Sequence, residues 1–179
     1  SGTAGEPITS CGGATSADGT FAFPLPHDAV TAAKLIRPHH DYAAIDIGVP
    51  LGTPLYAPVT GTVIAVFNTT VSWYAPAGGS CTSGQCSKCG IGLHIEDAYG
   101  WEWSICHMSR NDLTYGQTIT AGQPIGLTGN TGHSSGPHLH YGIRNPQGAS
   151  VCPQPLLTAL YNGSALPALA TLPTSGCTH

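Results

Sequence analysis

Charged side chains are scarce in this sequence, since Asp, Glu, Lys and Arg together account for 8% of its 179 residues. Lys and Arg number only five, which is too few for the basic surface that binds nucleic acid or an anionic membrane. No apolar run approaches the ~20 residues that a transmembrane helix needs. These absences predict that neither nucleic acid nor a membrane is a partner of this chain.

Long helical patterns are lacking as well, and turn-forming residues are abundant. The 24 Gly and 15 Pro residues favour short strands joined by tight loops. Apolar and polar residues alternate over 45–50 and 91–96, and 101–106 is expected to return as the second arm of a hairpin. Helical patterns are short, at 28–36 and 155–161. The sequence predicts an all-β fold, a small antiparallel sheet of about seven or more short strands with short peripheral helices.

The length and the hydrophobic content indicate one folded domain. A chain of 179 residues fits a single domain, and a hydrophobic share of 41% with a net charge of −4 argues against disorder. We expect a loose N-terminal leader at 1–25, a folded domain at 26–163 and a Pro-rich C-terminal tail at 164–179.

Cysteine is more frequent than expected for a small cytosolic protein. The chain has seven, and an exported protein of this size uses such residues as disulfide bonds, whereas a cytosolic one uses them to bind metal. We therefore predict a secreted, extracellular protein stabilised by disulfides. The odd number leaves at least one thiol unpaired within the chain.

The hairpin suggests which cysteines pair. Folding 91–96 onto 101–106 brings Cys106 near Cys89, so Cys89–Cys106 is the first predicted disulfide and Cys81–Cys86 the second. Cys11, Cys152 and Cys177 compete for one remaining bridge. An alternative is a structural zinc site made by Cys81, Cys86, Cys89 and Cys106, but its spacing fits such sites only in part.

Histidine outnumbers Lys and Arg together, with nine residues, which suggests a metal site. The first candidates are His39, His40 and Asp46 in the run from 38 to 46, at the start of a predicted strand. Imidazole nitrogen and carboxylate oxygen both bind zinc at ~2.0–2.2 Å. A solvated loop with incidental His residues is the alternative for this run.

A His-x-His element is the second candidate. In a strand, His138 and His140 lie on one face, ~7 Å apart, with Leu139 on the opposite, core-facing side. One imidazole can then bind a metal while the other acts on a water bound to it. Two exposed polar positions of an amphipathic strand would show the same pattern.

His107 is the third candidate, expected at the end of the hairpin's returning arm, where strands present polar groups to solvent. The loop 129–136, rich in Gly, Ser and Thr, would let the backbone approach a substrate beside the His pair. Two His and one Asp as ligands would leave a fourth position for water, which is typical of catalytic zinc. Such water ionises near pH 7 and attacks carbonyls, with the spare imidazoles taking its proton.

Four motifs in this order resemble the lysostaphin/LytM-type (M23) peptidoglycan endopeptidases. They are the His…Asp run at 38–46, Gly-Thr-Pro-Leu-Tyr-Ala-Pro-Val-Thr-Gly-Thr-Val at 52–63, Cys-His-Met-Ser at 106–109, and Ser-Ser-Gly-Pro-His-Leu-His-Tyr at 134–141. The resemblance covers 38–145 and implies a small antiparallel β structure with a substrate groove. It also implies an enzyme that cuts peptide bonds in peptidoglycan stem peptides or cross-bridges, with one Zn²⁺ per chain. We expect the chain to be a monomer.

The resemblance also implies a role for each site residue. Asp46 and His140 are metal ligands, and His107 and His138 are catalytic. The extra residues before Asp46 depart from the family's short spacing, so the first ligand is His39 or His40. Strand parity, by which alternate residues of an extended chain share a face, puts His40 on the side of Asp46 and so favours His40. The resemblance favours His39, which we adopt.

Three points stay open at this stage. His133 stands where a small hydroxyl residue is more usual, so it either contacts substrate or, as we prefer, is a solvent-exposed loop residue. A degenerate, non-enzymatic member of the family that regulates cell-wall hydrolases would be expected to lack ligands. A disulfide-rich extracellular binding module would hold no zinc.

Overall fold

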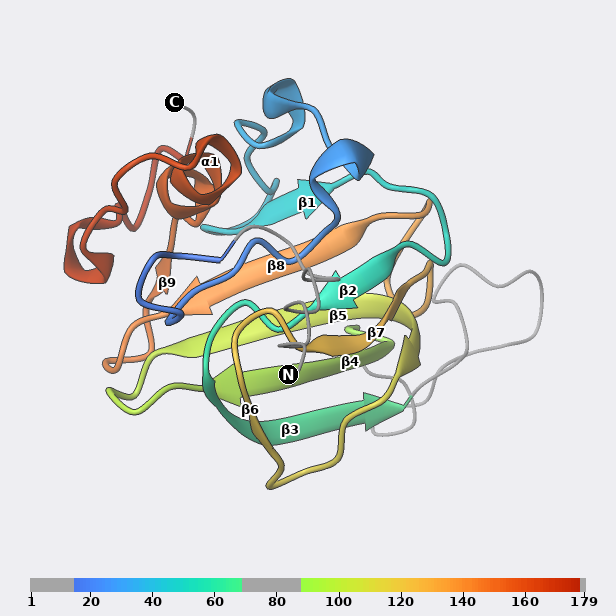
Figure 1. Ribbon diagram of the computed structural model, residues 1–179. Helices are drawn as coiled ribbons and strands as arrows, with labels where there is room; N and C mark the ends of the chain where they lie inside the picture. Colours follow the sequence, from blue (N-terminus) through green and yellow to red (C-terminus); the bar gives the residue numbers. More distant parts are fainter. Residues whose placement is uncertain (1–14, 69–87, 178–179) are drawn as a thin grey trace, which may run out of the picture.

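The computed structural model describes residues 15–68 and 88–177 and shows a single antiparallel sheet flanked by one α-helix (Figure 1). The strands are β1 (Ile45–Ile47), β2 (Pro54–Tyr56), β3 (Gly61–Asn68), β4 (Ile91–Glu96), β5 (Glu102–Asn111), β6 (Thr118–Ile119), β7 (Pro124–Thr128), β8 (Leu139–Arg144) and β9 (Ser150–Val151). The helix is α1 (Gln154–Asn162), and single turns of 3₁₀-helix are η1 (His27–Ala29), η2 (Ala32–Lys34) and η3 (Leu169–Thr171). Within the described ranges, no helix is both long and apolar enough to span a membrane.

The strands follow the spatial order β1-β8-β5-β4-β3-β6, with β2 and β7 paired beside β5 and β9 beside β8. Figure 1 shows β8, β5, β4 and β3 lying side by side across the molecule. The predicted all-β, antiparallel, disulfide-stabilised fold is confirmed. The predicted hairpin is the pair β4–β5, whose partners include Ile95 with Trp103 and Glu96 with Glu102.

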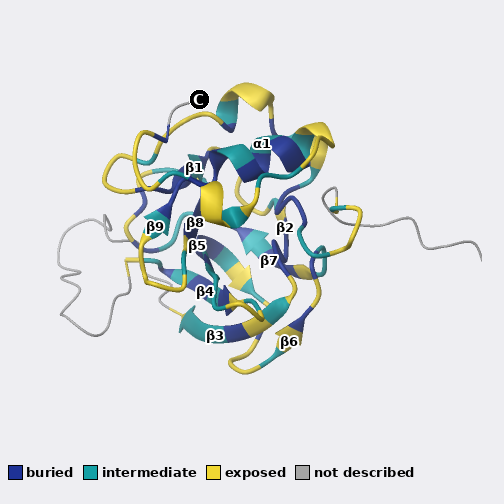
Figure 2. Cartoon of the chain, turned by 90° about the vertical axis from the view of Figure 1, so that its left-hand side faces the viewer, coloured by how far each residue is buried: buried dark blue, intermediate teal, exposed yellow. Residues whose placement is uncertain are grey.

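Alternation along the strands divides the sheet into an apolar and a polar face. Leu93, Ile95, Trp103, Ile105 and Leu139 are fully buried on the core side. Figure 2 shows buried positions alternating with less buried ones along the strands of the sheet. Because successive side chains point to opposite faces, the residues between them point the other way. The apolar face therefore supplies the core, and the polar face is left to build a groove.

Segments that precede and follow the strands in the chain complete the core. Leu156, Leu157 and Leu160 of α1 are buried in it, which confirms the predicted helix at 155–161. The helix ends at Gly163, which takes the left-handed conformation (φ 64°) that glycine adopts at low cost. The pattern at 28–36, in contrast, gives only the separate 3₁₀ turns η1 and η2 rather than one helix.

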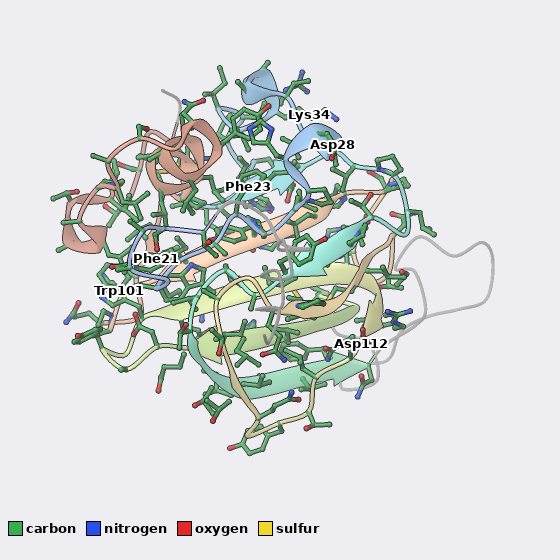
Figure 3. The ribbon with its side chains drawn as sticks, in the orientation of Figure 1. Phe21, Phe23, Asp28, Lys34, Trp101 and Asp112 are labelled. Atoms are coloured by element: carbon green, nitrogen blue, oxygen red, sulfur yellow. A yellow bond between two sulfur atoms is a disulfide. The ribbon has the colours of Figure 1, made fainter. Side chains whose placement is uncertain are left out.

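Part of the predicted leader packs against the sheet. Phe21 lies 6.0 Å from Trp103 and Phe23 lies 5.6 Å from Tyr161, measured between ring centroids, and Phe23 is fully buried (Figure 3). In the predicted tail, Leu172 is also buried. Apolar residues thus bring both ends of the described chain into the core, and the division at 25 and 163 stays a prediction.

Two disulfides lie among the described residues. Cys89–Cys106 links the start of β4 to β5, which confirms the first predicted pair and excludes these two thiols as zinc ligands. Cys152–Cys177 ties the tail to the end of β9, so Cys152 and Cys177 form the remaining bridge for which three cysteines competed. The predicted Cys81–Cys86 bond and Cys11 lie outside the described residues.

Removing the first bridge is expected to cost stability. The double variant Cys89→Ala/Cys106→Ala opens a loop of 17 residues, so its free energy of unfolding should fall by ~3 kcal/mol in denaturant titrations. Cys152→Ala/Cys177→Ala, with a sequence separation of 25, is the matched control. It should lose similar stability but leave the NMR resonances of the His107 ring in place, whereas the first variant should shift them. Equal His107 spectra in both variants would contradict the link between bridge and histidine.

Candidate active site

A groove of about 570 Å³ runs over the polar face of the sheet, and seven of the nine histidines line it. His27 does not line it, and His179 lies outside the described residues. Strands β1, β8 and β5 form the floor of the groove, while the segments 39–42 and 133–135 contribute to its walls. The groove thus collects residues that are far apart in the chain.

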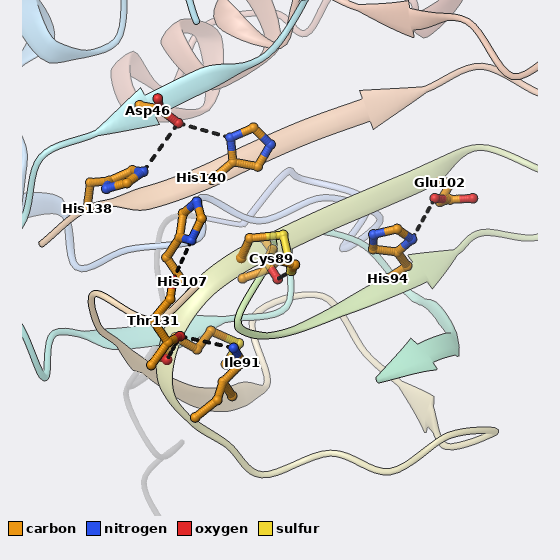
Figure 4. Close-up of a disulfide and its surroundings, with 12 residues drawn as sticks. Asp46, Cys89, Ile91, His94, Glu102, His107, Thr131, His138 and His140 are labelled. Carbon is orange, nitrogen blue, oxygen red and sulfur yellow. Dashed lines mark hydrogen bonds and ion pairs between the residues drawn. A yellow bond between two sulfur atoms is a disulfide. The ribbon is translucent and has the colours of Figure 1, made fainter. Parts of the chain in front are cut away.

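Asp46 and His140 meet because β1 pairs with β8. Their Cα positions are direct cross-strand partners, and His140 Nδ1 lies 2.9 Å from Asp46 Oδ1 (Figure 4). On the other side of the ring, Tyr42 Oη lies 3.1 Å from His140 Nε2. His140 is 5% exposed, so the position and tautomer of its ring are set by these two neighbours.

His39 and His40 both come near Asp46, and a ring nitrogen of each lies within 4.8 Å of a carboxylate oxygen and of the other ring nitrogen. Their surroundings differ. The side chain of His39 is 9% exposed with Nε2 3.7 Å from Asp46 Oδ2, whereas that of His40 is 69% exposed and pairs with Asp41 at 3.0 Å.

The chain between His39 and β1 is not extended. The backbone N–H of His39 donates to the carbonyl of Ala44, which closes a loop over residues 40–43. Strand parity therefore does not apply to this run, and the argument from parity for His40 fails. The loop directs the better-buried His39 ring toward Asp46.

His138 enters the groove just before β8. Its Nδ1 lies 2.8 Å from the carbonyl oxygen of Gly136 and 3.1 Å from Ser134 Oγ, and its Nε2 lies 3.6 Å from Asp46 Oδ1. Donation from Nδ1 to the Gly136 carbonyl places the ring proton there and leaves the Nε2 lone pair facing the site. His138 and His140 therefore share the groove face, as alternation predicts, with Leu139 fully buried beneath them.

His107 does not stand at a strand end as predicted. It lies inside the ten-residue strand β5, at a bulge where the register with β4 shifts, and its φ of 62° is the one positive value among the described non-glycine residues. A bulge re-aims a side chain within a strand. The His107 ring consequently faces His138, with 4.6 Å between ring centroids.

A backbone carbonyl also orients His107. Its Nδ1 lies 2.7 Å from the carbonyl oxygen of Thr131, so this nitrogen carries the proton and Nε2 is free to accept one (Figure 4). Burial lowers the pKa of His107 to about 4, although the Thr131 contact opposes that shift. The imidazole is therefore neutral at pH 7.

The charges around Asp46 keep it ionised. Burial raises the pKa of this carboxyl group, but the hydrogen bond from His140 and the neighbouring imidazoles outweigh burial and hold the pKa below its ordinary value. Burial likewise lowers the pKa of His39, with Asp46 opposing. A carboxylate and neutral imidazoles are the protonation states in which these groups bind a metal.

The donor types suit a divalent metal. Ligands at ~2.0–2.2 Å in a tetrahedron lie roughly 3.4 Å from one another. His140 Nδ1 lies 2.9 Å from Asp46 Oδ1 and His39 Nε2 lies 3.7 Å from Asp46 Oδ2, so the two imidazoles approach different oxygens of the carboxylate. The three ligand atoms that lie within 4.8 Å of one another belong to His39, His40 and Asp46. Binding through His39 Nε2 would move its proton to Nδ1 and release the 3.3 Å hydrogen bond from the Asp41 N–H.

The profile of Peptidase family M23 matches residues 40–153, well over half of the chain. The chain belongs to this family. The resemblance found in the sequence motifs is thereby confirmed, and the matched part includes Asp46, His107, His138 and His140, whereas His39 lies one residue before it.

Several curated proteins resemble this M23 domain. An uncharacterized metalloprotease of Haemophilus influenzae is 37% identical over 108 residues, 59% of this chain and 18% of that protein. The peptidoglycan DD-endopeptidase ShyA of Vibrio cholerae is 32% identical over 60% of this chain and 20% of that protein. Lysostaphin of Staphylococcus simulans is 31% identical over 54% of this chain and 17% of that protein. The M23 domain therefore spans about a fifth of the length of these relatives.

Solved structures share the fold of this M23 domain. A structure described as peptidase M23 from Pseudomonas aeruginosa superposes with a TM-score of 0.57 at 22% identity, over 86% of this chain and 55% of that one. The catalytic domain of lysostaphin from Staphylococcus simulans gives a TM-score of 0.51 at 20% identity, over 72% of this chain and 98% of that one. The predicted lysostaphin-like architecture is confirmed.

Three residues that orient the histidines of this M23 domain escaped the sequence analysis. Tyr42 contacts His140, Ser134 contacts His138, and Thr131 contacts His107. Ser134 and Thr131 belong to the loop 129–136, which was expected only to approach substrate. His133, in the same loop, is exposed at the groove rim, and its N–H donates to the carbonyl of Lys88.

Proposed function

We propose that this protein is a zinc-dependent endopeptidase that hydrolyses peptide bonds in peptidoglycan, within stem peptides or cross-bridges. The observation that carries the proposal is one groove in which Asp46 and His140, with His39, face two further imidazoles that have free Nε2 atoms. Membership of Peptidase family M23 supports a peptidase, and the names of ShyA and lysostaphin support peptidoglycan as the source of substrate.

In this proposal His39, Asp46 and His140 hold the zinc, and His40 is outside the ligand set. Zinc, when bound, would lower the pKa of a water molecule and polarise the scissile carbonyl. Binding through His140 Nδ1 moves the ring proton to Nε2, where Tyr42 Oη lies 3.1 Å away and accepts it. Tyr42 thus fixes the tautomer of a ligand.

His107 and His138 move protons. Each donates its Nδ1–H to a backbone carbonyl, of Thr131 and Gly136 respectively, so each presents an unprotonated Nε2 to the site. One Nε2 accepts a proton from the attacking water, and a protonated imidazole can later donate it to the leaving amine. An imidazolium in this position also stabilises the oxyanion that forms on the carbonyl.

The groove sits on a chain that we propose is secreted and monomeric. Two disulfides among the described residues suit an oxidising, extracellular compartment. Peptidoglycan lies outside the cell membrane as well, so the proposed localisation is consistent with the proposed substrate.

Digestion of defined muropeptides tests the function and the need for metal. The purified protein should release fragments that mass spectrometry assigns to cleaved peptide bonds, and a chelator should remove both zinc and activity, with recovery when zinc is restored. A protein that holds zinc but cleaves nothing would be a regulator of cell-wall hydrolases. A protein without zinc would be a binding module.

Thr131 allows a test of His107 orientation that leaves the histidine unchanged. Thr131 Oγ1 donates to the Met108 carbonyl at 2.7 Å and accepts from the Ile91 N–H at 2.9 Å, which ties the loop to β5 and β4. Thr131→Val breaks both bonds and should lower kcat about tenfold, since small misplacement of a catalytic group is costly. Zinc content should be unchanged, and Thr131→Ser should restore kcat. Equal loss in the Val and Ser variants would contradict the role of the hydroxyl.

A further inference from the structure

The polar face of the sheet continues beyond the histidines as a floor of small residues. Along β8, Gly142 follows His140 on the same face, and its cross-strand partner on β5 is Ser104. A Cβ atom on Gly142 would lie 2.7 Å from Ser104 Oγ, so a larger residue would displace the Ser104 hydroxyl. Small residues, Ser104 and Gly142, therefore line this part of the groove.

Beyond this floor lies a hydrogen-bonded pair. His94 Nδ1 lies 2.8 Å from Glu102 Oε1, with each side chain 23% exposed, and Figure 4 shows the pair displaced along β4 and β5 from the histidine cluster. Burial lowers the pKa of His94, opposed by Glu102 and aided by Arg144. A neutral His94 thus donates its Nδ1–H to the Glu102 carboxylate, so the carboxylate points toward His94.

Arg144 stands next to this pair. It is the direct cross-strand partner of Glu102 on one side and of Ser150 on the other, and Glu102, Arg144 and Ser150 all line the groove. Across residues 15–68 and 88–177, its guanidinium forms neither an ion pair nor a side-chain hydrogen bond. Because His94 engages the carboxylate of Glu102, the cross-strand partner of Arg144, an unpaired guanidinium beside a hydroxyl is left facing the groove.

We propose that Arg144, with Ser150, binds a carboxylate of the substrate peptide at the far end of the groove. A guanidinium recognises a carboxylate through two parallel hydrogen bonds. Arg144 lies four residues from His140 along β8, about 13 Å at strand spacing, so the carboxylate belongs within about four residues of the bond that is cut. The proposal rests on the proposed function for the statement that the ligand is a peptide, and it makes the enzyme prefer acidic stem peptides over uncharged glycine bridges.

Binding of three synthetic stem tetrapeptides, L-Ala-γ-D-Glu-L-Lys-D-Ala, tests this subsite. One has a free carboxylate only on γ-Glu, one only at the C-terminus, and one has carboxamides at both places. Titration calorimetry on the intact, zinc-loaded protein should show one single-carboxylate peptide binding about five- to tenfold more tightly than the double amide. Arg144→Gln should abolish that difference, and Arg144→Lys, which keeps the charge but not the fork, should retain part of it.

Arg110→Gln is the matched control, because Arg110 pairs with Asp112 and does not line the groove. It should keep the full preference. The subsite is disproved if the intact protein does not distinguish the three peptides, or if Arg144→Gln keeps the preference. A protein that shows the preference but hydrolyses no muropeptide would retain the subsite and overturn the proposed function, so the two failures are distinct.

Discussion

Replacing His140 by alanine is expected to abolish zinc binding and with it all measurable hydrolysis. His140 Nδ1 lies 2.9 Å from Asp46 Oδ1 and the residue is 5% exposed, so alanine here removes a proposed ligand that the fold holds directly against the carboxylate. Loss of an outer-shell partner alone typically costs 10–100-fold in metal affinity, and loss of a ligand should exceed about 100-fold. Metal analysis of the purified variant and its rate on muropeptides measure both effects.

His39 and His40 give this prediction an internal control. His39→Ala should lose zinc as His140→Ala does, whereas His40→Ala should keep it, because the His40 side chain is exposed and pairs with Asp41. Circular dichroism confirms that each variant is folded. Zinc retained in His39→Ala and lost in His40→Ala would reverse the choice between the two residues.

Replacing His138 by alanine is expected to separate metal binding from catalysis. The variant should keep its zinc, since His39, Asp46 and His140 remain, but should lose about 10²–10⁴ in kcat, the usual contribution of a positioned acid or base. The free Nε2 of His138 lies 3.6 Å from Asp46 Oδ1, close enough to reach a molecule held beside the ligands. Kinetics with defined muropeptides, at a measured zinc content, check the result.

His27→Ala is the control for the loss of an imidazole, because His27 lies outside the groove and stacks on Tyr161. It should change kcat little. His107→Ala should behave as His138→Ala does, with zinc kept and kcat reduced. If His138→Ala and His140→Ala lost zinc equally, the division into ligand and catalytic residues would be wrong.

The sequence was informative wherever the spacing of residues alone determines the face of a strand on which a side chain lies. Period-2 alternation predicted β1 and β4, and the hairpin that follows from it predicted the first part of β5. The same alternation placed His138 and His140 on the face opposite Leu139. The hairpin also predicted the Cys89–Cys106 bond, because paired strands bring known positions together. These are local rules, and a strand obeys them whatever its surroundings.

Spacing failed where the backbone leaves the regular strand. Residues 40–43 form a closed loop, so parity could not choose between His39 and His40. The bulge at His107 turns a mid-strand side chain into the groove, which no alternation rule anticipates. In the sequence, Thr131 and Ser134 indicated only that 129–136 is a loop. In the structure, their hydrogen bonds orient His107 and His138.

The sequence by itself determined the strand class, the polar and apolar faces, and the chemical types of the candidate ligands, because these depend on residue identity and short-range periodicity. Only the tertiary structure decided which nitrogen of each ring faces Asp46, which of two adjacent histidines is buried beside it, and that Arg144 shares the groove. Those features arise from contacts between β1, β8 and β5, residues up to about a hundred positions apart, and each depends on differences of an ångström or two that spacing in the chain does not encode.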